Sequence, residues 1–100
     1  MSQIKVATTG DISDGTGKVV EIEGKTIAVF NCGGKFYATT NTCPHRGGPL
    51  GEGQVEGSIV TCPWHGWEIE VASGRCLTNP AAAVASYPVE VNGEDILVTL

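Results

Sequence analysis

The sequence has little histidine, little positive charge and no long apolar segment. Its 100 residues include only two histidines, and six lysines and arginines against eleven aspartates and glutamates give a net charge of −5. An acidic chain is a poor partner for nucleic acid or for an anionic membrane, because both carry negative charge themselves. No run of eighteen apolar residues is present, so we expect no membrane-spanning helix.

The N-terminal segment lacks the features of a secretory signal peptide. Residues 1–7 contain neither a long apolar core nor a small-residue cleavage site, so we expect a soluble, cytoplasmic protein. At 100 residues the whole chain, 1–100, is expected to form a single domain. A hydrophobic content of 41% with 17% charged residues argues against disorder.

No segment shows a sustained helical period, and the alanine-rich residues 80–85 are too short to predict a helix. Short stretches of strand composition are separated by turn signals instead, and Asn92-Gly93 predicts a type I′ hairpin turn. Many short strands predict an all-β fold, an antiparallel sandwich or barrel. The other turn signals are Glu23-Gly24, Gly33-Gly34, Gly57-Ser58 and Ser73-Gly74, and the expected strands cover residues 4–8, 19–22, 26–30, 35–39, 54–56, 59–61, 68–71, 87–91 and 96–100.

Both histidines stand beside cysteines in two loops rich in glycine and proline. The first motif, C-P-H-R-G-G, contains Cys43 and His45, and the second, C-P-W-H-G-W, contains Cys62 and His65, with sixteen residues between His45 and Cys62. Two thiolates and two imidazoles suit either zinc or an iron–sulfur cluster. Zinc fingers usually pair Cys with Cys and His with His, whereas each loop here offers one of each. This order favours two bridged irons, with the Cys of each loop on one iron and the His on the other.

The paired loops resemble those of the Rieske family, in their residues and in the interval between them. The resemblance implies that Cys43 and Cys62 bind one iron and His45 and His65 the other, in a single [2Fe-2S] cluster. It also implies the Rieske fold, an antiparallel β base with a small cluster-binding subdomain, residues 41–76, inserted in it. Residues 78–80 are similar to the family's third, proline-containing loop, which covers the cluster.

Two absences indicate a branch of that family. Quinol-oxidising Rieske proteins carry a further Cys in each loop, and those two form a disulfide, but Gly48 and Trp64 occupy these positions here. The same proteins place hydroxyl side chains after the second motif that raise the reduction potential, where this chain has Trp67 and Ile69. We therefore expect a potential toward the low end of the Rieske range of about −150 to +300 mV. The chain most resembles the ferredoxin components of ring-hydroxylating dioxygenase systems.

The resemblance implies a carrier of single electrons that is not itself an enzyme. Its expected partners are a flavoprotein reductase that uses NADH or NADPH and a terminal oxygenase. A catalytic Rieske subunit needs an additional two-histidine, one-carboxylate iron site, and no histidine remains beyond His45 and His65. We expect the electron to leave through these two imidazoles. Two alternatives stay open, namely a Rieske-type small subunit of another redox complex such as nitrite reductase, and a zinc-stabilised structural module.

The remaining candidates have structural interpretations. Cys32 and Cys76 lie outside the motifs and, in a reducing cytosol, are interpreted as buried, unreactive thiols that form no disulfide. Trp64 and Trp67 are expected to shield the cluster from water and to pack the loops. Arg46 is interpreted as a solvated surface charge, with a contact to an acidic partner as the alternative.

Overall fold

The chain consists almost entirely of short antiparallel β-strands. The computed structural model describes residues 3–42, 48–64, 66–79 and 81–99. Neither of the two short 3-10 helices in these ranges is long or apolar enough to cross a membrane. The elements are β1 (Gln3–Thr8), η1 (Thr9–Asp11), β2 (Gly17–Ile22), β3 (Lys25–Cys32), β4 (Lys35–Thr40), η2 (Leu50–Glu52), β5 (Gln54–Glu56), β6 (Ile59–Thr61), β7 (Glu68–Glu70), β8 (Arg75–Cys76), β9 (Ser86–Tyr87), β10 (Val89–Asn92) and β11 (Asp95–Thr99).

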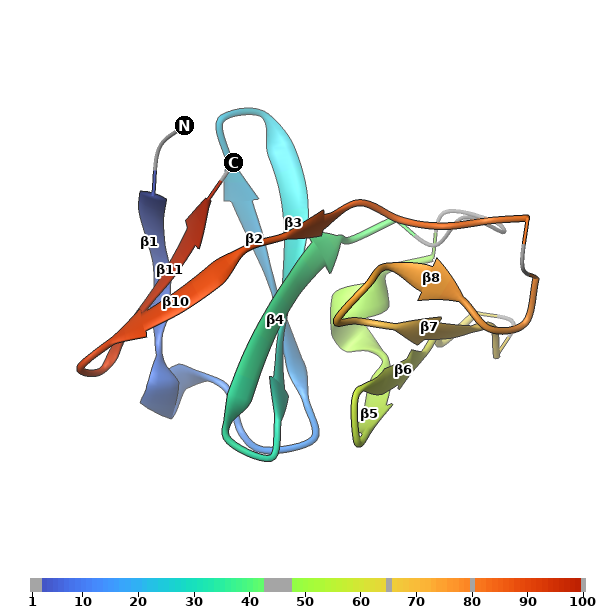
Figure 1. Ribbon diagram of the computed structural model, residues 1–100, viewed down its shortest axis with the longest axis horizontal. Coiled ribbons are helices and arrows are strands. Elements are labelled where there is room, and N and C mark those ends of the chain that lie inside the picture. Colours follow the sequence, from blue (N-terminus) through green and yellow to red (C-terminus); the bar gives the residue numbers. More distant parts are fainter. Residues whose placement is uncertain (1–2, 43–47, 65, 80, 100) are drawn as a thin grey trace.

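The strands form three sheets that follow one another across the molecule (Figure 1). The first sheet has the order β1-β11-β10, the second β2-β3-β4-β9 and the third β5-β6-β7-β8. All pairings within them are antiparallel. The second sheet lies between the other two. Because the elements are almost all strands and every pairing is antiparallel, the expected all-β, antiparallel fold class is confirmed.

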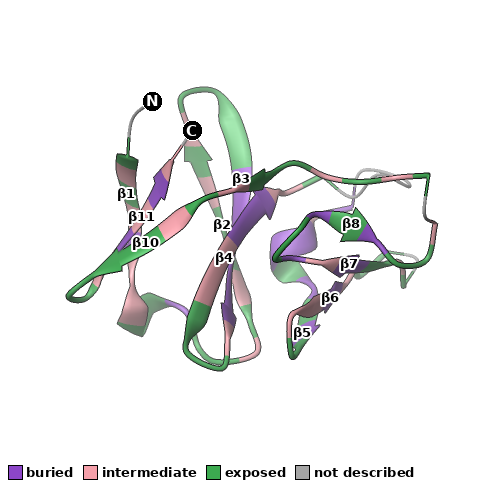
Figure 2. Ribbon diagram, in the orientation of Figure 1, coloured by how far each residue is buried: buried purple, intermediate pink, exposed green. Residues whose placement is uncertain are grey.

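Strand β3 is buried on both faces because it runs through this middle sheet. Ile27 and Val29 belong to one hydrophobic core, whereas Ala28 and Phe30 belong to another. Successive side chains of a strand point to opposite faces of its sheet, so one strand contributes to two cores. Figure 2 shows the buried positions gathered along β3 and β4 and on η2.

The two cores join the three sheets. The base core lies between the first and second sheets and includes Ala38 of β4 and Ile96 and Val98 of β11. The joint core connects the second sheet with the third and includes Leu50 of η2. It also includes the inward-facing residue of each strand of the third sheet, namely Val55, Val60, Ile69 and Cys76.

Local turn signals identified most hairpins correctly. Glu23-Gly24 and Gly33-Gly34 both have positive φ at both positions, as a type I′ turn requires. The prediction of a type I′ turn at Asn92-Gly93 is wrong. Asn92 pairs with Asp95, so Gly93 and Glu94 form the turn, and only Gly93 has positive φ, which is the type II′ pattern.

Two strand predictions need correction. The expected strand over residues 87–91 is two strands, because Pro88 lacks the N–H that would continue the ladder of β9 with β4. The chain leaves the second sheet at Pro88 and enters the first sheet as β10. Strand β8 was not expected, and its two residues pair with Ile69 and Glu70 of β7.

We expect Phe30→Ala to destabilise the protein strongly, because this ring is fully buried in the joint core. The expected loss in free energy of unfolding is about 3–5 kcal/mol. Denaturant titration measures it, with Val91→Ala as the control because Val91 is 44% exposed on β10. Equal losses in the two variants would contradict the two-core description.

Candidate metal centre

The second motif forms a tight loop between β6 and β7. The Cys62 N–H donates to the Trp67 carbonyl at 2.7 Å, and the Gly66 N–H donates to the Cys62 carbonyl at 3.0 Å. Gly66 has a φ of 74°, in the left-handed region that glycine adopts without strain. These bonds hold Cys62 at the neck of the loop, where the residue is 2% exposed.

The first motif is closed at its base by contacts on both sides. Thr42 and Pro49 form an antiparallel bridge across the loop. The Asn41 carbonyl accepts a hydrogen bond from the Leu50 N–H at 2.8 Å, and the Asn41 Oδ1 accepts one from the Gly51 N–H at 2.7 Å. Asn41 follows β4 and Leu50 begins η2, so both ends of the loop are anchored to the second sheet and to the joint core.

The two loops meet at Gly48. A Cβ added to Gly48 would lie 2.7 Å from Cys62 Sγ and 3.0 Å from Trp64 Cγ, closer than packed atoms allow. With Trp64 and Cys62 placed as they are, a side chain at position 48 would have to displace one of them. The neighbouring positions Gly48 and Trp64 are those where quinol-oxidising Rieske proteins carry their two additional cysteines. Neither residue can form a disulfide.

Of the four predicted ligands, the structure places only Cys62. Cys43, His45 and His65 lie outside the described residues, and so do Arg46 and Pro80. Within the described ranges no group of three or more His, Cys, Asp or Glu side chains is arranged to hold a metal ion. The setting of Cys62 fits a cluster ligand, because its thiol is buried where the two loops meet and faces a glycine that leaves it unobstructed.

The two tryptophans of the second motif differ in exposure. Trp67 is partly buried and packs against the joint core. Trp64 is 56% exposed although one edge of its ring faces Gly48. The sequence did not predict that one tryptophan would be partly buried and the other exposed, because both residues occur in one short motif.

Cys32 and Cys76 are free thiols, as predicted. Cys76 is buried in the joint core, whereas Cys32 is only partly buried beside it. Burial, reinforced by the Asp14 carboxylate, raises the pKa of the Cys32 thiol. A raised pKa keeps the thiol protonated, and a protonated thiol is a weak nucleophile and metal ligand.

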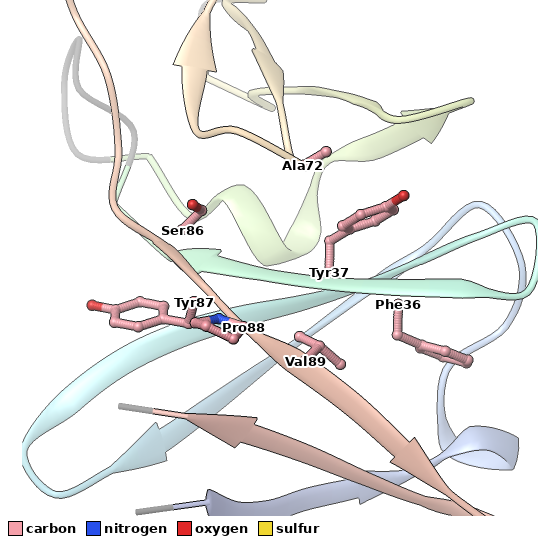
Figure 3. A pocket seen from close by; sticks show the side chains of 7 residues that line it. All are labelled: Phe36, Tyr37, Ala72, Ser86, Tyr87, Pro88 and Val89. Atoms are coloured by element: carbon pink, nitrogen blue, oxygen red, sulfur yellow. The ribbon is translucent and has the colours of Figure 1, made fainter. Parts of the chain in front are cut away.

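A groove of about 390 Å³ lies where the second sheet meets the turn between β7 and β8. Figure 3 shows Tyr37 of β4 extending toward Ala72 of that turn, with Phe36 and Val89 on the other side of β4. No local signal in the sequence predicts this groove, which the residues on both sides of Pro88 help to line. None of its described lining residues is a cysteine or histidine, so we do not assign it to the metal centre.

Comparison with known proteins shows the family of the chain. Residues 2–88 match the family model of the Rieske [2Fe-2S] domain, and the chain belongs to this family. Family membership assigns the chain a single [2Fe-2S] cluster and confirms the predicted resemblance.

Its relatives include ferredoxin components of dioxygenase systems. The chain is 33% identical to the naphthalene 1,2-dioxygenase ferredoxin component of Pseudomonas aeruginosa, covering 90% of this chain and 88% of the relative. It is 34% identical to the biphenyl 2,3-dioxygenase ferredoxin component of Rhodococcus jostii, and the match covers 100% of this chain and 94% of the relative. Among solved structures, the ferredoxin of carbazole 1,9a-dioxygenase from Nocardioides aromaticivorans superposes with a TM-score of 0.90 at 27% identity. The superposition covers 99% of this chain and 98% of that one.

We expect Gly48→Ala to impair cluster retention, because the added methyl group would collide with Cys62 Sγ. Iron and acid-labile sulfide per chain, with the visible absorption, measure this loss. Gly10→Ala is the matched control, since a Cβ at Gly10 would meet nothing within 4 Å. Full cluster content in both variants would contradict the close approach of the loops.

Proposed function

We propose that this protein carries single electrons from a flavin-dependent NAD(P)H reductase to a terminal Rieske oxygenase, and that it works in the cytoplasm. The likeness over nearly the whole chain to ferredoxin components of dioxygenase systems supports this role most strongly. A solved structure described as a complex of reduced oxygenase and oxidized ferredoxin contains a chain with 32% identity and a TM-score of 0.87, covering 96% of this chain and 100% of that one.

Within this proposal, Cys43 and Cys62 bind one iron and His45 and His65 the other. Residues 41–76 form the cluster-binding subdomain of a single domain, 1–100. The bound cluster supplies one-electron redox chemistry, and the chain's own residues hold it and exclude water from it. Supporting observations are the buried Cys62 thiol and the close approach of the loops at Gly48.

The surroundings of Cys62 support a low reduction potential. Hydrogen bonds to cluster sulfurs stabilise the reduced state, so fewer donors lower the potential. Ile69 is fully buried in the joint core, where it offers no hydroxyl group. Trp67 likewise occupies a position where quinol-oxidising proteins carry a hydroxyl side chain. The described part of the loops therefore lacks the two hydroxyl donors typical of high-potential Rieske proteins.

We expect the purified protein to be coloured, to contain iron and sulfide, and to accept one electron per chain in a reductive titration. Cys62→Ser should abolish reversible reduction at the native potential, because it removes a thiolate ligand. Cys32→Ser is the control, since Cys32 lies outside the motifs. A colourless protein with bound zinc and no redox wave would instead establish the zinc-stabilised module.

The exposed Trp64 supports docking of the partner at the loop end of the molecule. Leu77, whose N–H bonds to Glu68 just after the second motif, is a further apolar residue that is 37% exposed. Large aromatic side chains often contribute most of the energy of an interface when a partner buries them.

Trp64→Ala should therefore weaken binding to the terminal oxygenase by roughly tenfold or more, the effect of removing an aromatic anchor. Calorimetry or the concentration dependence of electron transfer measures this, in preparations with equal cluster content and reduction potential. Val91→Ala removes exposed apolar surface from the base and should leave binding unchanged. Unaltered affinity in Trp64→Ala would argue against docking at this end.

A second candidate keeps the electron-carrying role and changes the partner. A putative NADH-dependent nitrite reductase small subunit from Mycobacterium tuberculosis superposes with a TM-score of 0.89 at 25% identity, covering 97% of this chain and 93% of that one. Pull-down with this protein as bait distinguishes the two, because either an oxygenase or a nitrite reductase subunit would be recovered. The higher identity to dioxygenase ferredoxins favours the first candidate.

A further inference from the structure

The third loop, which follows β8, is fastened to the end of the second motif. The ladder between β7 and β8 ends with the pair Ile69 and Cys76. One step further, the Leu77 N–H donates to the Glu68 carbonyl at 2.8 Å. The Glu68 N–H then donates to Thr78 Oγ1 at 2.9 Å. A side-chain hydroxyl therefore accepts the hydrogen bond that a backbone carbonyl would accept in a continuing ladder.

This bond lies one peptide unit from the neck of the second motif. Glu68 follows Trp67 directly, and the Trp67 carbonyl accepts the 2.7 Å hydrogen bond from the Cys62 N–H. The peptide that joins Trp67 to Glu68 thus bonds to Cys62 at one end and to Thr78 at the other. Because a peptide unit is rigid, a shift at Thr78 is transmitted to the backbone of Cys62.

Other hydrogen bonds shape the third loop internally. The Asn79 N–H donates to the buried Cys76 Sγ at 3.4 Å. The Ala81 N–H donates to Asn79 Oδ1 at 3.0 Å, and the Ala82 N–H donates to the Asn79 carbonyl at 3.0 Å. These bonds shape the described residues of the loop, 77–79 and 81–82. The Thr78 hydroxyl bonds the start of this loop to Glu68, just after the second motif.

We propose that Thr78 is a positioning residue for the metal centre, and that its hydroxyl holds the start of the third loop against the strand that leaves the second motif. The inference rests on the proposed function, because it concerns access of water to a cluster held between the loops. Two ferric ions, two sulfides, two thiolates and two neutral imidazoles sum to zero charge, so the reduced cluster carries one negative charge. Water stabilises the charged form, so loosening the loop raises the reduction potential and speeds cluster loss.

The test compares Thr78→Val, which removes the hydroxyl at nearly constant size, with Thr78→Ser, which keeps it. Thr78→Val should lose its cluster to an iron chelator roughly fivefold faster, the factor expected for one lost hydrogen bond. Its reduction potential should be higher than that of the wild type in voltammetry. Thr78→Ser should restore both values toward those of the wild type.

Thr16→Val is the matched control, because the Thr16 hydroxyl donates to the Ser13 carbonyl at 2.6 Å in a turn of the base. This variant loses one hydrogen bond of a threonine hydroxyl that lies outside the motifs. Its reduction potential and its rate of cluster loss should therefore match those of the wild type. Wild-type behaviour of Thr78→Val would overturn the proposal. Equal cluster loss in Thr78→Val and Thr16→Val, at unchanged potential, would overturn it as well, because it would indicate general destabilisation.

Hydrogen–deuterium exchange on the wild-type protein tests the hydrogen bond if Thr78→Val does not fold. The proposal requires the Glu68 amide to exchange slowly, since it is bonded to Thr78 Oγ1. Exchange at the rate of an unprotected amide would overturn it. This outcome is distinct from failure of the proposed function, which a wild-type protein without iron and sulfide would reveal.

Discussion

The whole structure depends on the burial of β3 on both faces. Four successive residues of this strand are fully buried, and they alternate between the base core and the joint core. A shift of one residue in register would exchange the two sets, placing Phe30 where Val29 packs. Because the register of β3 is fixed in this way, β4 is fixed beside it. The stem of the first motif follows directly from β4, so the register also determines where the metal centre lies.

The metal centre combines firmly anchored loop bases with close contact between the loops. Asn41 anchors the first motif, and the bond from Cys62 to Trp67 closes the second. At the point of contact, Gly48 contributes no side chain, so the thiol of Cys62 meets backbone directly. Such a construction suits electron transfer, which breaks no protein bond and is fastest when the surroundings of the carrier change little between its two redox states.

The sequence predicted the parts of the structure that local signals specify. Paired turn residues such as Gly33-Gly34 identified hairpins because the preference of glycine for positive φ is local and needs no contact with distant segments. The two motifs were recognised for a similar reason, since ligand type and spacing are written in the sequence. Strand β8 was missed because two residues carry no periodicity, and only their pairing with β7 makes them a strand. The contact between Gly48 and Cys62 and the bond from Glu68 to Thr78 join distant segments, so no local signal could have predicted them.

The distribution of polar groups around Cys62 explains how one fold can serve carriers of different potential. The joint core beneath the second motif is apolar, and the strand that leaves this motif places Ile69 inside it. A hydroxyl at such a position would be buried and would need an acceptor, because an unpaired polar group in an apolar core is costly. In quinol-oxidising Rieske proteins, as the resemblance implies, such a hydroxyl bonds the cluster and raises the reduction potential. The aliphatic side chain of Ile69 avoids this requirement, and under the proposed function its lack of a donor leaves the reduced state less stabilised, which suits a donor to an oxygenase.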